Sequence, residues 1–139
     1  MKVFVCIANN NGISFNGRNV SRDAAVCEKI LQIVKDHPLI YIGNKPGSRT
    51  EDEQLIEEVV YKDEKYPDES LYCFINGVDI EPVMDRIDTI YLIHWNRDYP
   101  ADTFFHEEWL DDFLLKNTTN FEGRSHREIT MEEWIKCEN

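Results

Sequence analysis

The segment from Asn11 to Arg18 has the residue types and spacing of a loop that could hold a phosphate group or cover a substrate. Gly12 and Gly17 lie five positions apart, after an apolar run and before a helical pattern, which is the setting of a nucleoside-triphosphate loop. Arg18 and Asn19 follow, where such a loop needs lysine and a hydroxyl. We interpret the segment either as a substrate-side loop, whose candidate ligand contacts are Asn11, Gly12, Gly17 and Arg18, or as a turn in which both glycines supply positive φ.

Other site chemistries lack a motif in this sequence. G-x-G-x-x-G and C-x-x-C do not occur, and the histidines show neither H-E-x-x-H nor a paired spacing. No metal site is therefore predicted, and His94, at a strand end, is expected to be hydrogen-bonded structure. A nucleophilic serine or cysteine also has no local signature.

The net charge limits the classes of partner, and the length limits the number of domains. The chain has 139 residues, 27 of them acidic and 15 basic, and its net charge of -12 repels phosphate backbones and anionic membrane surfaces. We expect no nucleic-acid or membrane partner. A hydrophobic content of 42% suits one compact domain over residues 1–139. The oligomeric state is left open.

The cysteines and the first residues indicate a cytoplasmic protein. The opening apolar run, within MKVFVCIANN, is too short for the core of a signal peptide, and no segment is long enough to span a bilayer. The four cysteines are scattered, and three of them lie in apolar contexts. We expect reduced thiols, three of which pack in the core.

Strand-like and helix-like segments alternate along the chain. Helices are expected from Ser21, as the cap, to about Asp36, from a capping box at residues 50–53, and over residues 78–87 with Pro82 near the first turn. Strands are expected at residues 1–8, 38–43, 58–62, 69–77 and 88–96. This alternation predicts the α/β class, with a largely parallel central sheet and flanking helices. The remainder, residues 97–139, is placed only loosely, with one strand near Arg124 to Ile129.

Four separated pieces, in this order, resemble the dihydrofolate reductase fold, to which the reductase domain of riboflavin biosynthesis is related. FVCIANNNGISFNG resembles the family's first strand and mobile substrate loop, and SRDAAVCEKILQIVKDHPLIYIGNKP resembles its first helix and next strand. YCFINGVDIEPVMDRIDTIYLIHW is similar to the strand that ends in a diglycine, the short helix and the following strand, and YPADTFF to the family's G-D-T motif. The resemblance covers most of the chain. It implies a shortened version of that fold, with the opening loop as a substrate-side lid.

The resemblance also implies where NADPH would bind. The family meets the cofactor phosphate at G-R-x-T, where this chain has Gly43, Asn44 and Lys45, and Asn76 and Gly77 replace its diglycine. We therefore keep Gly43, Asn44, Asn76 and Gly77 as candidate ligand contacts. The cofactor is left open, because these departures argue against the ordinary mode of NADPH binding.

A carboxylate on the first helix of the reductases holds the pterin ring and aids its protonation. Asp23 and Glu28 are the two candidates for this catalytic position, and differing loop lengths leave open which of them occupies it. Without the resemblance, Asp23 is expected to complement the helix dipole, and Glu28 to be solvated beside Lys29. Asp102 and Thr103 match the family's D-T and are expected to tie strand and loop together.

Other segments resemble small proteins of gut clostridia. The shared pieces are NNG-x-x-F-N-x-R, W-N-R-x-Y-P-A-D-T and a terminal G-x-S-H-x-x-I-T-x-E, and some of those proteins are labelled ribonuclease Z. The clustered H-x-H-x-D-H that such zinc-dependent hydrolysis needs is missing from this sequence. We therefore single out residues 16–23 and 95–103. Their arginines Arg18, Arg22 and Arg97 either meet an anionic ligand or pair with carboxylates.

Three functions stay open on the sequence. The first, which we favour, is binding of a small anionic or heterocyclic ligand without conventional NADPH chemistry. The second is an active NAD(P)H-dependent reductase with Asp23 or Glu28 as the proton donor. The third is a non-enzymatic protein-interaction module that uses the acidic surface and the aromatic tail between Trp109 and Trp134.

Overall fold

The computed structural model describes residues 1–35, 37–43, 60–61 and 72–137. The predicted contact at Asn44 and the capping box at residues 50–53 lie outside the described residues. Within the described part of the chain, no helix is long and apolar enough to cross a membrane.

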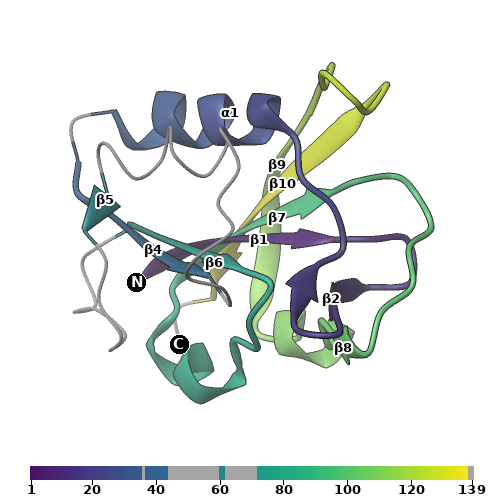
Figure 1. Ribbon diagram of the computed structural model, residues 1–139. Helices are drawn as coiled ribbons and strands as arrows, with labels where there is room; N and C mark the ends of the chain where they lie inside the picture. Colours follow the sequence, from purple (N-terminus) through teal and green to yellow (C-terminus); the bar gives the residue numbers. More distant parts are fainter. Residues whose placement is uncertain (36, 44–59, 62–71, 138–139) are drawn as a thin grey trace.

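A seven-stranded mixed sheet forms the centre of the molecule (Figure 1). Its order is β5 (Val60–Tyr61), β4 (Leu39–Gly43), β6 (Tyr72–Asn76), β1 (Lys2–Ile7), β7 (Thr89–His94), β10 (Ile129–Lys136) and β9 (Phe113–Phe121). In this order, each of the first five strands is parallel to the next of the five, whereas β10 runs antiparallel to both β7 and β9. The predicted α/β class is therefore confirmed, and the sheet combines a parallel part with an antiparallel hairpin.

Strand β1 lies in the middle of the sheet because its residues are apolar on both faces. Phe4 and Cys6 pack with helix α1 (Ala24–Val34), and Val3, Val5 and Ile7 belong to the core on the opposite face. A continuous apolar run is typical of such a doubly covered strand. The expected burial of three cysteines is confirmed at Cys6, Cys27 and Cys73.

Helix α1 covers one face of the sheet with a stripe of buried residues that recur at helical spacing. Its N-cap is Asp23 and not Ser21 as predicted, because the Asp23 side chain accepts the Ala25 N–H at 2.9 Å. The helix ends at Val34, two residues before the predicted end, and Lys35 follows with a positive φ of 51°.

Two short 3₁₀ helices lie on the opposite side of the sheet from α1. η1 (Glu81–Arg86) is the helix predicted over residues 78–87, and Pro82 stands in its first turn as expected. η2 (Glu107–Leu110) precedes β9. Ile80 and Val83, at and within η1, are almost completely buried against the core.

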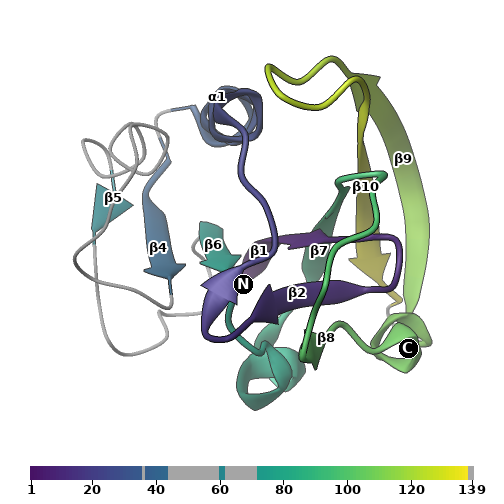
Figure 2. The ribbon, with the colours of Figure 1, turned by 45° about the vertical axis from the view of Figure 1, so that its right-hand side comes forward.

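The predicted mobile loop is a β-hairpin. β2 (Gly12–Phe15) pairs with β3 (Arg18–Asn19) and with β8 (Thr103–Phe104) in a separate three-stranded sheet, which comes forward in Figure 2. Asn16 and Gly17, with φ of 51° and 74°, form the two-residue turn, as Asn-Gly favours in a type I′ hairpin. Gly17 thus supplies the predicted positive φ.

Gly12 has a different role from the predicted turn. It is buried in β2, and a Cβ on it would lie 2.3 Å from the Cβ of Ala101. Glycine is required there for close packing of the hairpin against the segment before β8.

The C-terminal third forms a hairpin of two long strands, β9 and β10, with a register shift between Glu133 and Trp134. The single strand predicted near Arg124 to Ile129 is wrong. Most of those residues belong to the loop that joins the two strands, and this loop reaches the N-terminal end of α1 (Figures 1 and 2).

Candidate ligand site at the N-terminus of helix α1

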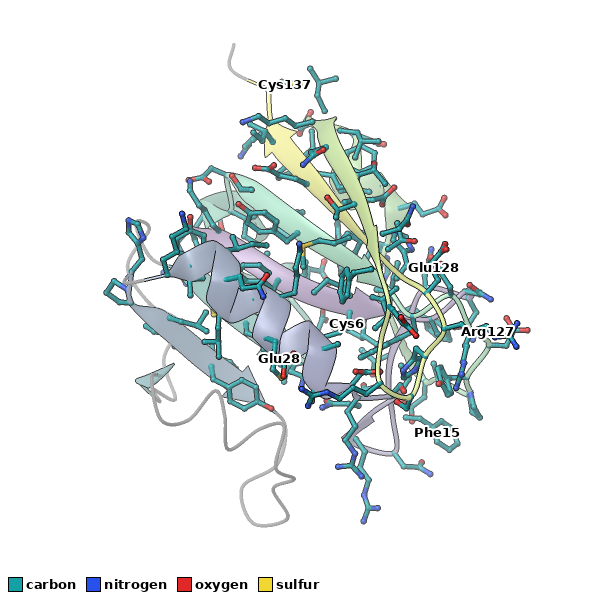
Figure 3. All side chains as sticks on the ribbon, turned by 90° about the horizontal axis from the view of Figure 1, so that it is seen from above. Cys6, Phe15, Glu28, Arg127, Glu128 and Cys137 are labelled. Carbon is teal, nitrogen blue, oxygen red and sulfur yellow. The ribbon has the colours of Figure 1, made fainter. Side chains whose placement is uncertain are left out.

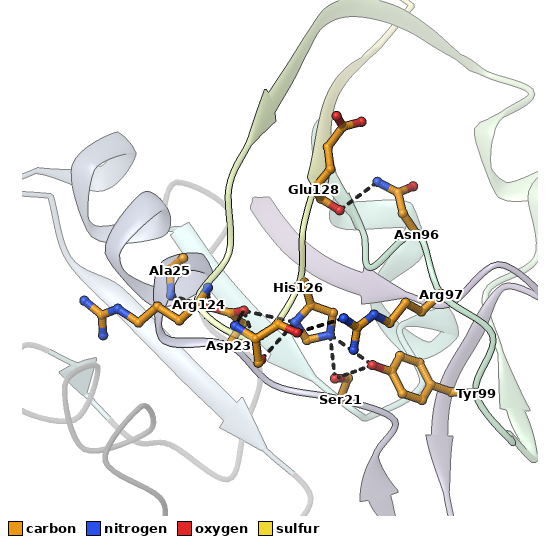
Figure 4. Close-up of polar contacts among 10 residues, drawn as sticks. Ser21, Asp23, Ala25, Asn96, Arg97, Tyr99, Arg124, His126 and Glu128 are labelled. Atoms are coloured by element: carbon orange, nitrogen blue, oxygen red, sulfur yellow. Dashed lines mark hydrogen bonds and ion pairs between the residues drawn. The ribbon is translucent and has the colours of Figure 1, made fainter.

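The carboxylate of Asp23 joins α1 to the loop between β9 and β10 (Figure 4). Its Oδ1 accepts the N–H groups of Ala25 at 2.9 Å and Arg124 at 3.0 Å. Its Oδ2 accepts the Ser125 N–H at 2.9 Å, the Ser125 hydroxyl at 3.1 Å and His126 Nδ1 at 2.9 Å. Asp23 is only 4% exposed, so these bonds replace water around the charge.

A glycine lets the loop approach the carboxylate this closely. A Cβ on Gly123 would lie 2.5 Å from Asp23 Oδ2 and 2.8 Å from the backbone oxygen of His126. Any larger residue would therefore separate the loop from Asp23. Arg97 also holds the loop, since its guanidinium donates to the Ser125 backbone oxygen at 2.9 Å.

The surroundings of Asp23 keep it ionised. Burial of the carboxylate raises its pKa, but hydrogen bonds from the Arg124 N–H, the His126 ring and the N–H groups of Ser125 and Ala25 outweigh burial and hold the pKa well below its usual range. The carboxylate therefore accepts hydrogen bonds and donates none.

His126 continues the network towards two hydroxyl groups. Its Nε2 lies 3.0 Å from Ser21 Oγ and 3.0 Å from the Tyr99 hydroxyl oxygen, and Ser21 Oγ donates to that oxygen at 3.1 Å. The ring is 3% exposed and stacks on Trp95 with 4.7 Å between centroids. Because Asp23 only accepts, Nδ1 carries a proton, and Nε2 is the ring nitrogen that faces the two hydroxyls.

A small hollow, which we call the inner hollow, adjoins this network at the carboxyl ends of β1, β4 and β6. It is lined by apolar and aromatic side chains and by a few polar ones, among them Cys6, Ser21, Asp23, Tyr41, Asn76 and Trp95. Its cavity volume of about 20 Å³ holds roughly one water molecule. Asn76 Nδ2 donates to the Tyr41 hydroxyl at 3.3 Å, whereas the buried indole N–H of Trp95 has no partner among the residues that the structure describes.

The structure brings some of the predicted site residues together. Asp23 and Asn76 both line the inner hollow, and Gly43 is the register partner of Asn76 on the neighbouring strand. Gly77 follows β6 with a positive φ of 79°, which a turn glycine adopts readily.

Other predicted site residues lie elsewhere. Glu28 forms an ion pair with Arg124 in which both side chains are about half exposed. Gly17 and Arg18 are at the exposed end of the β2–β3 hairpin, where a Cβ on Gly17 would meet no atom of the described residues within 4 Å. Figure 3 shows the neighbouring Phe15 at the periphery of the molecule. The D-T pair does connect segments as expected, because Asp102 Oδ2 accepts the Asn16 N–H at 3.0 Å.

A second hollow, the outer hollow, lies on the opposite face of the sheet. It has a cavity volume of about 670 Å³ and includes the predicted contact Asn11, whose Nδ2 donates to Glu107 Oε1 at 3.3 Å. His94 Nε2 and Glu132 Oε1 are 2.6 Å apart there, so His94 is hydrogen-bonded as expected. The other carboxylates that line it are Glu107, Glu108 and Asp111.

Sequence reasoning missed Trp95, Tyr99, Ser125 and His126 as parts of one site. Two of its segments, residues 16–23 and 95–103, do supply Ser21, Asp23, Trp95 and Tyr99, and the G-x-S-H piece supplies the loop. The sequence therefore shows the three motifs separately, but nothing in it indicates that they meet. No group of three or more His, Cys, Asp or Glu side chains among the described residues could hold a metal ion.

Comparison with known proteins supports the fold. No protein-family model matches the chain, and no curated protein matches it significantly. Among solved structures, it is similar to dihydrofolate reductase from Enterococcus faecalis complexed with NADP(H) and RAB-propyl, with a TM-score of 0.63 and 12% identity. The match covers 99% of this chain and 96% of that chain.

The chain has a dihydrofolate reductase-like fold. This confirms the resemblance drawn from the four sequence pieces. The low identity carries no information about the ligand or the reaction. The resemblance to clostridial proteins labelled ribonuclease Z is not shown by these comparisons and stays a prediction.

Proposed function

We propose that the protein binds a small heterocyclic ligand, neutral or anionic, at the inner hollow, without conventional NADPH chemistry. The observation that carries this proposal is the buried N–H of Trp95, which has no partner among the described residues and belongs to a side chain that lines the same hollow as Asn76. An orphaned buried donor costs free energy that a ligand acceptor would recover. Ring nitrogens and carbonyl groups are such acceptors.

The position and the walls of the hollow support the same ligand class. Ligands of open α/β sheets bind at the carboxyl ends of the strands, where the inner hollow lies. Tyr41, Phe74 and Trp95 supply aromatic walls, and Arg22 adds a positive charge at the exposed side. The polar edge of the ligand enters the hollow, and the remainder lies across its mouth.

The hydrogen bonds of Asp23 argue against the role that the resemblance implies for a carboxylate on the first helix. A carboxylate that holds a pterin ring needs free acceptor positions facing the ligand, but both oxygens of Asp23 already accept hydrogen bonds from the protein. One glycine, Gly77, stands where the family has two, and this also disfavours ordinary cofactor binding. The reductase and interaction-module alternatives stay predictions.

Thermal unfolding with a panel of pteridines, flavins and nucleotides tests the proposal. A ligand at 100 times its Kd stabilises the fold by about 2.7 kcal/mol, which raises Tm by several degrees. Asn76→Ala should reduce this shift, and Asn11→Ala, in the outer hollow, is the matched control. Flat curves across the panel would refute the proposal. Saturable NADPH binding followed by cofactor fluorescence would instead favour the reductase.

A further inference from the structure

Ser21, His126 and Asp23 are linked in the order of a nucleophile, a base and a carboxylate that orients the base. We propose that Ser21 is an activated nucleophile and that the protein hydrolyses small carboxylic esters through an acylated Ser21. This inference rests on the proposed function in one respect, because the inner hollow must admit a small molecule. It assigns a reaction that neither the fold nor the sequence motifs suggest.

The distances satisfy the requirements for an activated serine. Ser21 Oγ lies 3.0 Å from His126 Nε2, and His126 Nδ1 lies 2.9 Å from Asp23 Oδ2. A nucleophile and its base need a separation of about 2.6–3.2 Å, with a third group that orients the base. The Asp23 carboxylate fixes the tautomer in which Nε2 can take the serine proton.

The base is held rigidly in this orientation. Asp23 is fixed by four hydrogen bonds in addition to the one from His126, and the imidazole stacks on Trp95 at an interplanar angle of 29°. Such preorganisation keeps the geometry of a site within the tolerance that catalysis needs. A histidine that served only to fill space would not require two oriented ring nitrogens.

Ser21 is accessible to a small molecule, whereas its base, His126, is buried. Ser21 is partly exposed and lines the inner hollow, while His126 is 3% exposed behind it. Trp95 lines the same hollow, and its indole N–H has no hydrogen-bond partner in the part of the chain that the structure describes. That N–H is the donor available to the oxygen of a bound carbonyl group, where negative charge develops during acyl transfer.

Tyr99 competes with Ser21 for the base. Its hydroxyl oxygen lies 3.0 Å from the same His126 Nε2 and accepts the Ser21 hydroxyl in the resting arrangement. Removal of this hydroxyl leaves Ser21 as the hydroxyl that remains beside Nε2. Tyr99 is therefore a restraining residue, and its loss should make Ser21 more reactive.

The reaction balances with water as the co-reactant. Ser21 Oγ bonds to the ester carbonyl carbon as its proton moves to His126 Nε2, and the carbon–oxygen bond to the alcohol breaks as that alcohol takes the proton. Water then attacks the acyl-serine, giving a proton to Nε2, and the serine oxygen leaves and recovers that proton. The net products are a carboxylic acid and an alcohol.

A fluorophosphonate probe tests this directly, because Ser21 Oγ would displace fluoride and retain the phosphonyl group. Intact-mass and peptide mass spectrometry should find one adduct on Ser21 of the wild type. Ser21→Ala should lose it, Tyr99→Phe should gain it at least threefold faster, and Ser14→Ala, at a buried serine of β2, should be labelled like the wild type. Hydrolysis of 4-nitrophenyl acetate should follow the same order.

No adduct on Ser21 in folded wild type and Tyr99→Phe, under conditions that fully label a serine protease, would overturn the inference. An equal rate of labelling in Ser21→Ala would also overturn it. Tm shifts with heterocycles but no adduct would defeat the nucleophile alone. An adduct without any Tm shift would defeat the heterocycle proposal alone.

Discussion

The two hollows lie on opposite faces of the same sheet and use their polar side chains in opposite ways. The buried carboxylate of Asp23 lines the inner hollow, and it bonds to the buried imidazole of His126 behind the hollow and to the Ser125 N–H, both from a distant part of the chain. In the outer hollow, the carboxylates face a cavity of about 670 Å³, and the closest pair, His94 and Glu132, is partly exposed. The difference indicates that the inner polar groups stabilise the fold, whereas the outer ones chiefly set local charge.

The largest expected effect is that of Asp23→Ala. This change leaves the buried His126 and several backbone N–H groups without acceptors, and we expect a loss of about 3–5 kcal/mol in the free energy of unfolding. Urea denaturation monitored by tryptophan fluorescence measures it. Glu28→Ala is the matched control on the same helix and should cost less than about 1 kcal/mol, because its ion pair is exposed. Equal losses of unfolding free energy for the two variants would contradict the conclusion that the buried polar groups beside the inner hollow stabilise the fold.

Gly123→Ala should have the next largest effect. The added Cβ would meet Asp23 Oδ2 and the His126 oxygen, so the loop must move, at a cost of about 2–3 kcal/mol. Gly17→Ala serves as the control, since its Cβ would meet no atom within 4 Å in the described part of the chain and only the positive φ of 74° is strained, at about 1 kcal/mol. The same denaturation measurement applies. A smaller loss of unfolding free energy for Gly123→Ala than for Gly17→Ala would contradict the close contact between the β9–β10 loop and Asp23.

The acid dependence of stability should be the third effect in size. The pKa of Asp23 is lowered in the folded state, so its contribution is fully present above the unfolded pKa of about 4 and is lost as the pH falls towards the folded pKa. Between pH 5 and pH 3, the wild type should therefore lose about 1 kcal/mol more than Asp23→Asn. Parallel curves of unfolding free energy against pH for the two proteins would refute this assignment.

Glu132→Gln should have the smallest effect. The His94–Glu132 pair is 28% and 22% exposed, so its removal should change the free energy of unfolding by less than about 1 kcal/mol. Thermal and urea unfolding of this variant and of Asp23→Asn would compare how much each hollow's polar groups contribute to the free energy of unfolding. A loss as large as that of Asp23→Asn would show that the outer hollow also stabilises the fold.

Buried strands were easier to predict from the sequence than exposed ones. β1, β4 and β7 are apolar on both faces and were predicted within a few residues. β9 was missed because most of its residues are exposed, which leaves no alternation to detect. The β2–β3 hairpin was not predicted, although Asn16 and Gly17 form the strongest short hairpin signal, because β2 and β3 have only four and two residues and show no alternating pattern.

The candidate site was less predictable because its parts meet only in three dimensions. Asp23 was proposed because the resemblance implies a carboxylate on the first helix, but its partner His126 is 103 positions away and has no metal or catalytic spacing around it. Local patterns also could not distinguish Asp23 from Glu28. Burial and hydrogen bonding now separate the two carboxylates, although the catalytic role of either stays a prediction.

The bond between Asp23 and the β9–β10 loop also affects how the chain reaches its native state. Asp23 and His126 are 103 positions apart, so their bond can form only after the β9–β10 loop has been synthesised, whereas the bond from the Ala25 N–H to Asp23 is local. Closing so long a segment is entropically costly and slow. Completion of the hairpin is thus expected to be the event that converts a partly ordered nascent chain into the finished protein.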